Sequence, residues 1–125
     1  MNENKDYLTQ TREFGSVNIS EEVISSIAAL AIDEVEGVAG LSASAGAELA
    51  EMLGRKNVTK GIRLTVDGQD VHVECYVIVL YGYAIPEVSV NIQDSVTGAV
   101  ESMTGLHVEE VNVNVTGISM AKKDR

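Results

Sequence analysis

The sequence is poor in cysteine, proline, tryptophan and basic residues, and these shortages exclude several classes of protein. The single cysteine, Cys75, leaves no internal disulfide. With no secretory leader in view, this predicts a reducing, cytoplasmic setting. Nine basic against 19 acidic residues give a formal net charge of −10. Phosphate backbones and anionic lipids repel such a chain, so we expect it to bind no nucleic acid and no lipid surface directly.

Long apolar runs are also missing. Between Gly61 and Pro86, an apolar stretch without a charged residue runs from Cys75 to Ile85. It is shorter than the roughly 18 apolar residues that span a bilayer, so we expect no direct membrane insertion. At 125 residues and 45% apolar, the chain is long enough for one domain with its own core. We expect a flexible N-terminal tail at 1–13, a single domain at 14–120 and a polar C-terminal tail at 121–125.

The segment from Gly61 to Pro86 organises the rest of the chain. Apolar residues alternate over 62–66 and again over 71–79, on either side of a glycine-containing turn at 67–70. A period of two around such a turn predicts a β-hairpin. From Tyr76 onward the second strand is apolar on both faces. We therefore expect both faces to be covered, either by helices or by another subunit.

Two long helices are predicted on either side of this hairpin. The first begins after Ser20, a good N-cap, and ends at Gly37. Its apolar stripe comprises Ile24, Ile27, Ala28, Ala31 and Val35, widened by Val23 and Leu30. The second begins at Ile85 and Pro86, carries a stripe that reaches Met103, and ends at the cap Gly105.

The remaining segments complete the predicted fold. Residues 15–20 and 110–119 suit strands, residues 38–44 suit a loop, and residues 45–53 suit a short helix. The order is β-α-(α)-β-β-α-β. We predict an α+β domain with a small antiparallel or mixed sheet of about four strands and two long helices.

Cys75, His72 and His107 are the side chains best suited to catalysis or metal binding, and their settings favour neither. Cys75 stands in mid-strand among valines, where a buried thiol is expected. The histidines fall on different elements with no further ligand at metal-site spacing, so we expect surface residues. An enzyme would need His72, Cys75 and a carboxylate in one pocket, and their separation onto different faces would exclude this.

The carboxylate clusters also have ordinary interpretations. Residues 67–70 lack the length and the final glutamate of a calcium loop, so we expect only a turn. Solvated carboxylates, rather than a pair for acid-base chemistry, are expected at Asp33, Glu34, Glu36, Glu109 and Glu110. The glycines form no phosphate-binding motif. We assign no catalytic, cofactor-binding or metal-binding residue, and we expect no cofactor.

Apolar and aromatic side chains gather where the hairpin passes into the second long helix. They are Tyr76, Ile78, Leu80, Tyr81, Tyr83 and Ile85. Tyrosine combines an apolar body with a polar tip, which suits a protein interface as well as a core. Both interpretations stay open, and these six residues are our candidate protein-interaction site.

Four short motifs lie at the ends of the predicted elements. They are G-x-V-x-I-S at 15–20, E-x-x-G-V at 34–38, Y-x-I-V-x-Y-G-x-x-I-P-E at 76–87 and V-N-V-x-V-x-G at 111–117. Their combination, over about residues 14–119, resembles the alkaline-shock, or envelope stress response, family of Gram-positive and related bacteria. The resemblance implies a small, acidic cytoplasmic protein that self-associates and sits beneath the cell membrane through a separate membrane-anchored partner. It implies no enzyme activity.

Two functions are consistent with these observations. The first is a non-enzymatic envelope stress response protein that forms a homo-oligomer and docks on a membrane-anchored protein at the cytoplasmic face of the membrane. The alternative is a cytosolic regulatory module that binds a metabolic enzyme or a small ligand. Recovery of a membrane protein or of a cytosolic enzyme would distinguish them.

Overall fold

A computed structural model describes residues 7–42, 58–59 and 61–120. The predicted short helix at 45–53 lies outside the described residues. Two helices and seven strands follow in the order β1 (Tyr7–Arg12), β2 (Gly15–Ser20), α1 (Glu21–Asp33), β3 (Val38–Leu41), β4 (Val58–Thr59), β5 (Ile62–Asp67), β6 (Asp70–Leu80), α3 (Ile85–Thr104) and β7 (His107–Ser119). The predicted α+β class is confirmed.

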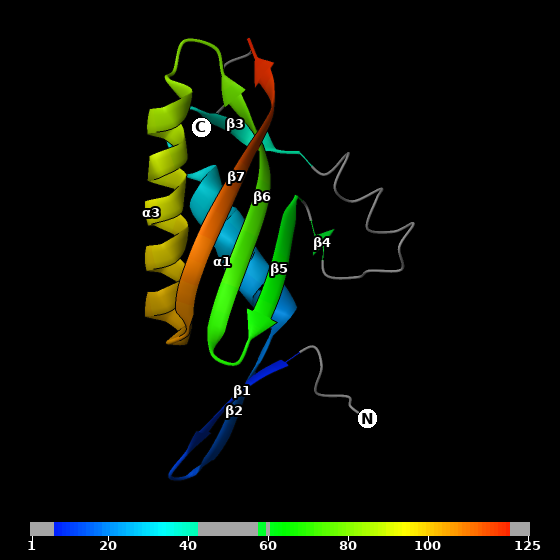
Figure 1. The fold of residues 1–125 in the computed structure, drawn as a ribbon, viewed down its shortest axis with the longest axis vertical. Helices are drawn as coiled ribbons and strands as arrows, with labels where there is room; N and C mark the ends of the chain where they lie inside the picture. The colour runs from blue at the N-terminus through cyan, green and yellow to red at the C-terminus, as the bar shows by residue number, and fades with distance from the viewer. Residues whose placement is uncertain (1–6, 43–57, 60, 121–125) are drawn as a thin grey trace.

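Strand β6 is the centre of the larger sheet. On one edge it pairs in parallel with β7 along its whole length. It also pairs antiparallel with β5 through residues 70–75 and with β3 through residues 77–79. The five-stranded sheet is therefore mixed, with β4 attached to β5 (Figure 1).

The core lies between the helices and one face of this sheet. Residues 71, 73, 75, 77 and 79 of β6 are buried with at most 1% exposure, whereas the residues between them are partly exposed. The buried residues form one apolar cluster with Ile24 and Ile32 of α1 and with Ile92 and Val96 of α3. Both helices therefore cover the same face of the sheet (Figure 1).

The helix boundaries follow local capping chemistry. The Ser20 side chain accepts a hydrogen bond from the Glu22 backbone N–H at 3.1 Å, as expected of an N-cap. Pro86 lies in the first turn of α3, and Gly105 ends that helix in the left-handed conformation. Helix α1 ends at Asp33, four residues before Gly37, because the chain there tightens into a turn.

The apolar stripes of the helices are narrower than predicted. Val23 and Leu30 were expected to widen the core stripe of α1, but they are 49% and 68% exposed. Met103, at the end of the α3 stripe, is 69% exposed. A sheet of this width covers only one side of each helix, so residues at the margins of the stripe stay in solvent.

Two segments differ from the sequence interpretation because strand pairing decides them. Residues 38–41, expected in a loop, form β3, since Val38 pairs with Val79 of β6. Residues 7–12, expected in a mobile tail, form β1 in a hairpin with β2 (Figure 1). Leu8 of this hairpin is buried in the core.

The hairpin is held to the body by two side-chain hydrogen bonds. The Gln10 side-chain amide donates to the Thr104 carbonyl at 2.8 Å, at the end of α3. The Gln69 side-chain amide donates to the Thr9 carbonyl at 3.3 Å, at the β5–β6 turn. The hairpin therefore docks at the end of the domain where β6 and β7 begin.

Gly37 is required by both conformation and space. Its φ is +98°, and a Cβ there would lie 2.8 Å from Val88 Cγ2 and 2.9 Å from the Tyr83 ring. Backbone strain and overpacking should together lower the free energy of unfolding of Gly37→Ala by about 2–5 kcal/mol. Urea denaturation measures this change.

Gly98→Ala is the matched control. Gly98 lies inside α3, and a Cβ there would meet no atom within 4 Å. Alanine should raise the free energy of unfolding by about 0.5–1 kcal/mol, because glycine is the weaker helix former. Equal effects of the two substitutions would contradict the assignment of Gly37 to a close contact.

Candidate functional site

The face of β6 that points away from the helices changes character along the strand. Its first part carries His72 and Glu74, and its second part carries Tyr76, Ile78 and Leu80. All five side chains are partly exposed. The expectation that both faces are covered is met on one face by the helices, and no described helix covers the other, which is called the open face below.

The polar part of this open face is slightly hollow. A cavity of about 320 Å³ is lined by Arg63, Thr65, His72, Val73, Glu74, Glu110 and Asn112. Arg63 forms an ion pair with Glu74, and His72 Nδ1 lies 3.1 Å from Glu110 Oε2. Because Arg63 is already paired with Glu74, its guanidinium is not free to bind an anionic ligand in the hollow.

The apolar part is shaped by two glycines. Ile78 is paired with Gly40 of β3 on one side and with Gly117 of β7 on the other. A Cβ at Gly40 would meet no atom within 4 Å, and one at Gly117 would lie 3.8 Å from Ile78 Cγ1. Ile78 therefore projects between two positions without side chains, with Tyr76 and Leu80 before and after it on the same strand.

The structure divides the six predicted interaction residues into two groups. Tyr76, Ile78 and Leu80 form a row on the open face of β6. Tyr81, Tyr83 and Ile85 lie around the corner, in the turn and at the start of α3, with exposures of 70%, 41% and 41%.

Tyr83 uses part of its surface within the chain. Its ring packs against Gly37, and its hydroxyl donates to Glu36 Oε2 at 3.3 Å. A change at Tyr83 would therefore disturb the turn after α1 as well as any contact outside. Ile78 and Leu80 are better probes of the open face.

Sequence reasoning missed two glycines of this surface and one exposed aromatic residue elsewhere. Gly40 and Gly117 gain their significance only from strand pairing, which no local pattern reveals. Phe14, at the turn between β1 and β2, is 97% exposed. A phenylalanine directly before Gly15 at a strand start was a visible signal of an exposed apolar turn.

Cys75 and His72 lie on opposite faces of β6, so they share no pocket. Cys75 is fully buried, and its thiol lies 3.6 Å from the Asn112 carbonyl oxygen, to which it donates. Burial, with a smaller contribution from the Glu74 charge, raises the pKa of Cys75 to about 12. A thiol of this pKa does not act as a nucleophile near neutral pH.

The five carboxylates that the sequence analysis expected in solvent, at positions 33, 34, 36, 109 and 110, are exposed. Asp33, Glu34 and Glu36 are exposed beside the turn after α1. At the start of β7, Glu110 pairs with His72, whereas Glu109 lies beside His107. Asp70, from the β5–β6 turn, joins Glu109 and His107 in one cluster of potential ligand atoms.

Among the described residues, no helix is both long enough and apolar enough to cross a membrane.

Comparison with known sequences identifies the family. Residues 9–120 match the profile of the alkaline-shock protein 23 family, described by its cell envelope-related function. The chain belongs to this family. The resemblance seen in the four sequence motifs is thereby confirmed.

Relatives of this chain occur in Bacillus subtilis and Streptococcus pyogenes. The B. subtilis proteins YqhY and YloU, both named as uncharacterized, are 31% and 33% identical to it. The alignments cover 87% and 85% of this chain and 81% and 90% of those proteins. A stress response regulator gls24 homolog of S. pyogenes is 30% identical over 94% of this chain and 65% of its own length.

A solved structure, MamM-CTD, shares part of the chain path. Its TM-score is 0.48 at 18% identity, over 77% of this chain and 96% of that chain. A similarity of this extent does not bear on function.

The burial of Cys75 predicts a thiol that resists alkylation. With a pKa of about 12, only about one thiol in ten thousand is ionised at pH 8. Iodoacetamide at pH 8 should therefore modify the folded protein at least about 100-fold more slowly than the protein in 8 M urea. Mass spectrometry over time measures both rates.

The rate in the folded protein should rise with pH, because deprotonation supplies the thiolate. Fast modification of the folded chain at pH 8 would contradict the burial of Cys75.

Proposed function

We propose that this alkaline-shock family member is a non-enzymatic envelope stress response protein that self-associates and docks on a membrane-anchored protein at the cytoplasmic face. The apolar row Tyr76, Ile78 and Leu80 on the open face of β6 carries the proposal. Apolar residues at alternate positions on an uncovered sheet face favour burial against another protein surface.

The shape of the row supports packing against a second sheet or helix. Ile78 stands between Gly40 and Gly117, so a partner's side chains have room on both sides of it. Burial of a side chain such as isoleucine contributes about 1.5–3 kcal/mol, and several such residues are needed to offset the loss of freedom on association.

The charge of the chain favours a protein partner at the envelope. A cell envelope-related function supports a place near the membrane, whereas the net charge of −10 opposes contact with anionic lipid. A membrane-anchored protein resolves this conflict, because it supplies the attachment without requiring the chain to touch lipid.

Ile78→Glu tests self-association. It places a charge in the middle of the apolar row, so the dissociation constant of the oligomer should rise at least about tenfold. Sedimentation velocity over a range of concentrations measures the change, and thermal unfolding reports whether the protomer is intact.

Thr65→Glu is the control on the same face. Thr65 is exposed at the polar end, opposite His72 in the strand register. It should leave association unchanged. If the wild-type chain is a monomer at every concentration, the self-association part of the proposal fails; if Ile78→Glu unfolds the protomer, Ile78 belongs to its core.

A photo-crosslinking amino acid at position 78, compared with one at position 65, tests docking in the native cell. We expect a membrane protein crosslinked from position 78 only. Recovery of a single cytosolic enzyme, with no membrane protein, would instead favour the regulatory module that the sequence also allows.

A further inference from the structure

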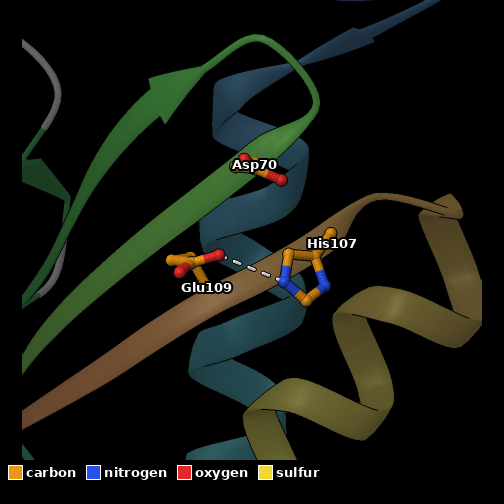
Figure 2. Close-up of side chains that lie close together, drawn as sticks. All are labelled: Asp70, His107 and Glu109. Atoms are coloured by element: carbon orange, nitrogen blue, oxygen red, sulfur yellow. Dashed lines mark hydrogen bonds and ion pairs between the residues drawn. The ribbon is translucent and has the colours of Figure 1, made fainter.

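His107, Asp70 and Glu109 meet where β6 and β7 begin. Asp70 is the register partner of His107 in the parallel pair, and Glu109 follows two residues later at an irregularity in the register. One ligand atom from each of the three residues lies within 4.8 Å of the other two (Figure 2). From the sequence alone, His107 is expected on the surface, Asp70 in a turn and Glu109 in solvent.

The backbone holds these side chains on regular elements. The His107 N–H donates to the Gln69 carbonyl at 3.1 Å, which ties the start of β7 to the β5–β6 turn. Asp70 is the first residue of β6, and Glu109 lies within β7. Ligands carried by paired strands are positioned more precisely than ligands on loops.

Both ring nitrogens of His107 face carboxylates. Nδ1 lies 3.3 Å from Glu101 Oε2, and Nε2 lies 3.2 Å from Glu109 Oε1. A neutral imidazole has one donor and one acceptor nitrogen, and an ionised carboxylate only accepts. In a neutral ring, the lone pair of the acceptor nitrogen therefore points at a lone pair of a carboxylate oxygen. A proton or a metal ion between the two atoms would remove this repulsion.

Glu101 is held in position to accept a hydrogen bond from Nδ1 of His107. Its Oε2 also accepts the backbone N–H of Val108 at 2.9 Å, so this carboxylate is fixed beside Nδ1. A donated Nδ1–H leaves the lone pair of Nε2 directed toward Glu109. This is the arrangement of metal-binding histidines, whose second nitrogen donates to a carboxylate.

Local charge favours a divalent ion over a single proton. Glu101, Glu109 and Asp70 together bring three negative charges around one imidazole. Within the described part of the chain, the ion pairs of Glu101 and Glu109 are made to His107 and to no lysine or arginine. One proton on the ring neutralises a third of this charge, whereas a divalent cation neutralises most of it.

We propose that Asp70, His107 and Glu109 bind a divalent first-row transition ion, such as Zn²⁺, and that Glu101 orients His107. One imidazole nitrogen with two carboxylate oxygens suits Zn²⁺ or Mn²⁺ better than Ca²⁺ or Mg²⁺, which prefer oxygen alone. Two ligand atoms that each lie about 2.0–2.2 Å from one ion are at most about 4.3 Å apart. The ligand atoms here lie within 4.8 Å of one another, so small side-chain rotations would complete the site.

The two histidines of the chain provide a direct assay. The tag-free protein is titrated with Zn²⁺ while the imidazole signals are followed by NMR, and calorimetry gives the stoichiometry. We expect saturable binding of one ion with a shift of the His107 signal. The His72 signal should stay unchanged, because the only carboxylate that pairs with His72 among the described residues is Glu110. Mn²⁺ should broaden His107 first.

Substitutions separate ligands from neighbours. His107→Gln, Asp70→Asn and Glu109→Gln should each weaken Zn²⁺ binding at least about tenfold, and His72→Gln should not. Glu101→Gln keeps an acceptor for the Val108 N–H but loses the charge behind His107, and it should weaken binding about 10–100-fold. All five positions are on the surface, so circular dichroism should show intact folds.

Three results would overturn the proposal. In the first, Zn²⁺ does not shift the NMR signal of His107. In the second, Zn²⁺ shifts the signals of His72 and His107 equally. In the third, His107→Gln and Glu109→Gln bind Zn²⁺ with the affinity of the wild-type chain. A His107 ring that responds to acid but not to either metal ion would show that a proton alone occupies this position. None of these results bears on self-association through the other end of β6.

Discussion

The structure depends on the burial of one face of β6 beneath the two helices. Val71, Val73, Cys75, Val77 and Val79 occupy alternate positions, and each is at most 1% exposed. Because side chains alternate across a strand, a slip of one residue would place all five in solvent. This constraint fixes the register of β6 and, through its hydrogen bonds, the positions of β3, β5 and β7.

The same alternation decides what lies on the open face. With the odd-numbered residues committed to the core, the even-numbered ones from His72 to Leu80 must point away from the helices. Their order along the chain therefore becomes an order in space, from charged pairs at one end to an apolar row at the other. The open face has a polar end and an apolar end because β6 is apolar on only one face at its start and on both faces from Tyr76 onward.

The two proposals concern opposite ends of β6. The row around Ile78 lies near the end of β6, beside Gly117 of β7, and suits contact with another protein. The cluster around His107 lies where β6 and β7 begin, close to the β1–β2 hairpin that docks there through Gln10 and Gln69. Since β6 and β7 run in parallel between them, binding at one end leaves the other end accessible.

The sequence by itself determined the elements whose causes are local. Ser20 and Gly105 cap helices through their own chemistry, Gly68 allows the turn at 67–70 with a φ of +66°, and a period of two marks the hairpin. Only the tertiary structure decided that residues 38–41 form a strand, that β7 lies parallel to β6, and that Asp70 meets His107. Those outcomes depend on pairing between segments distant in the sequence. Local propensity and spacing carry no information about that pairing, because its free energy comes from the shared core.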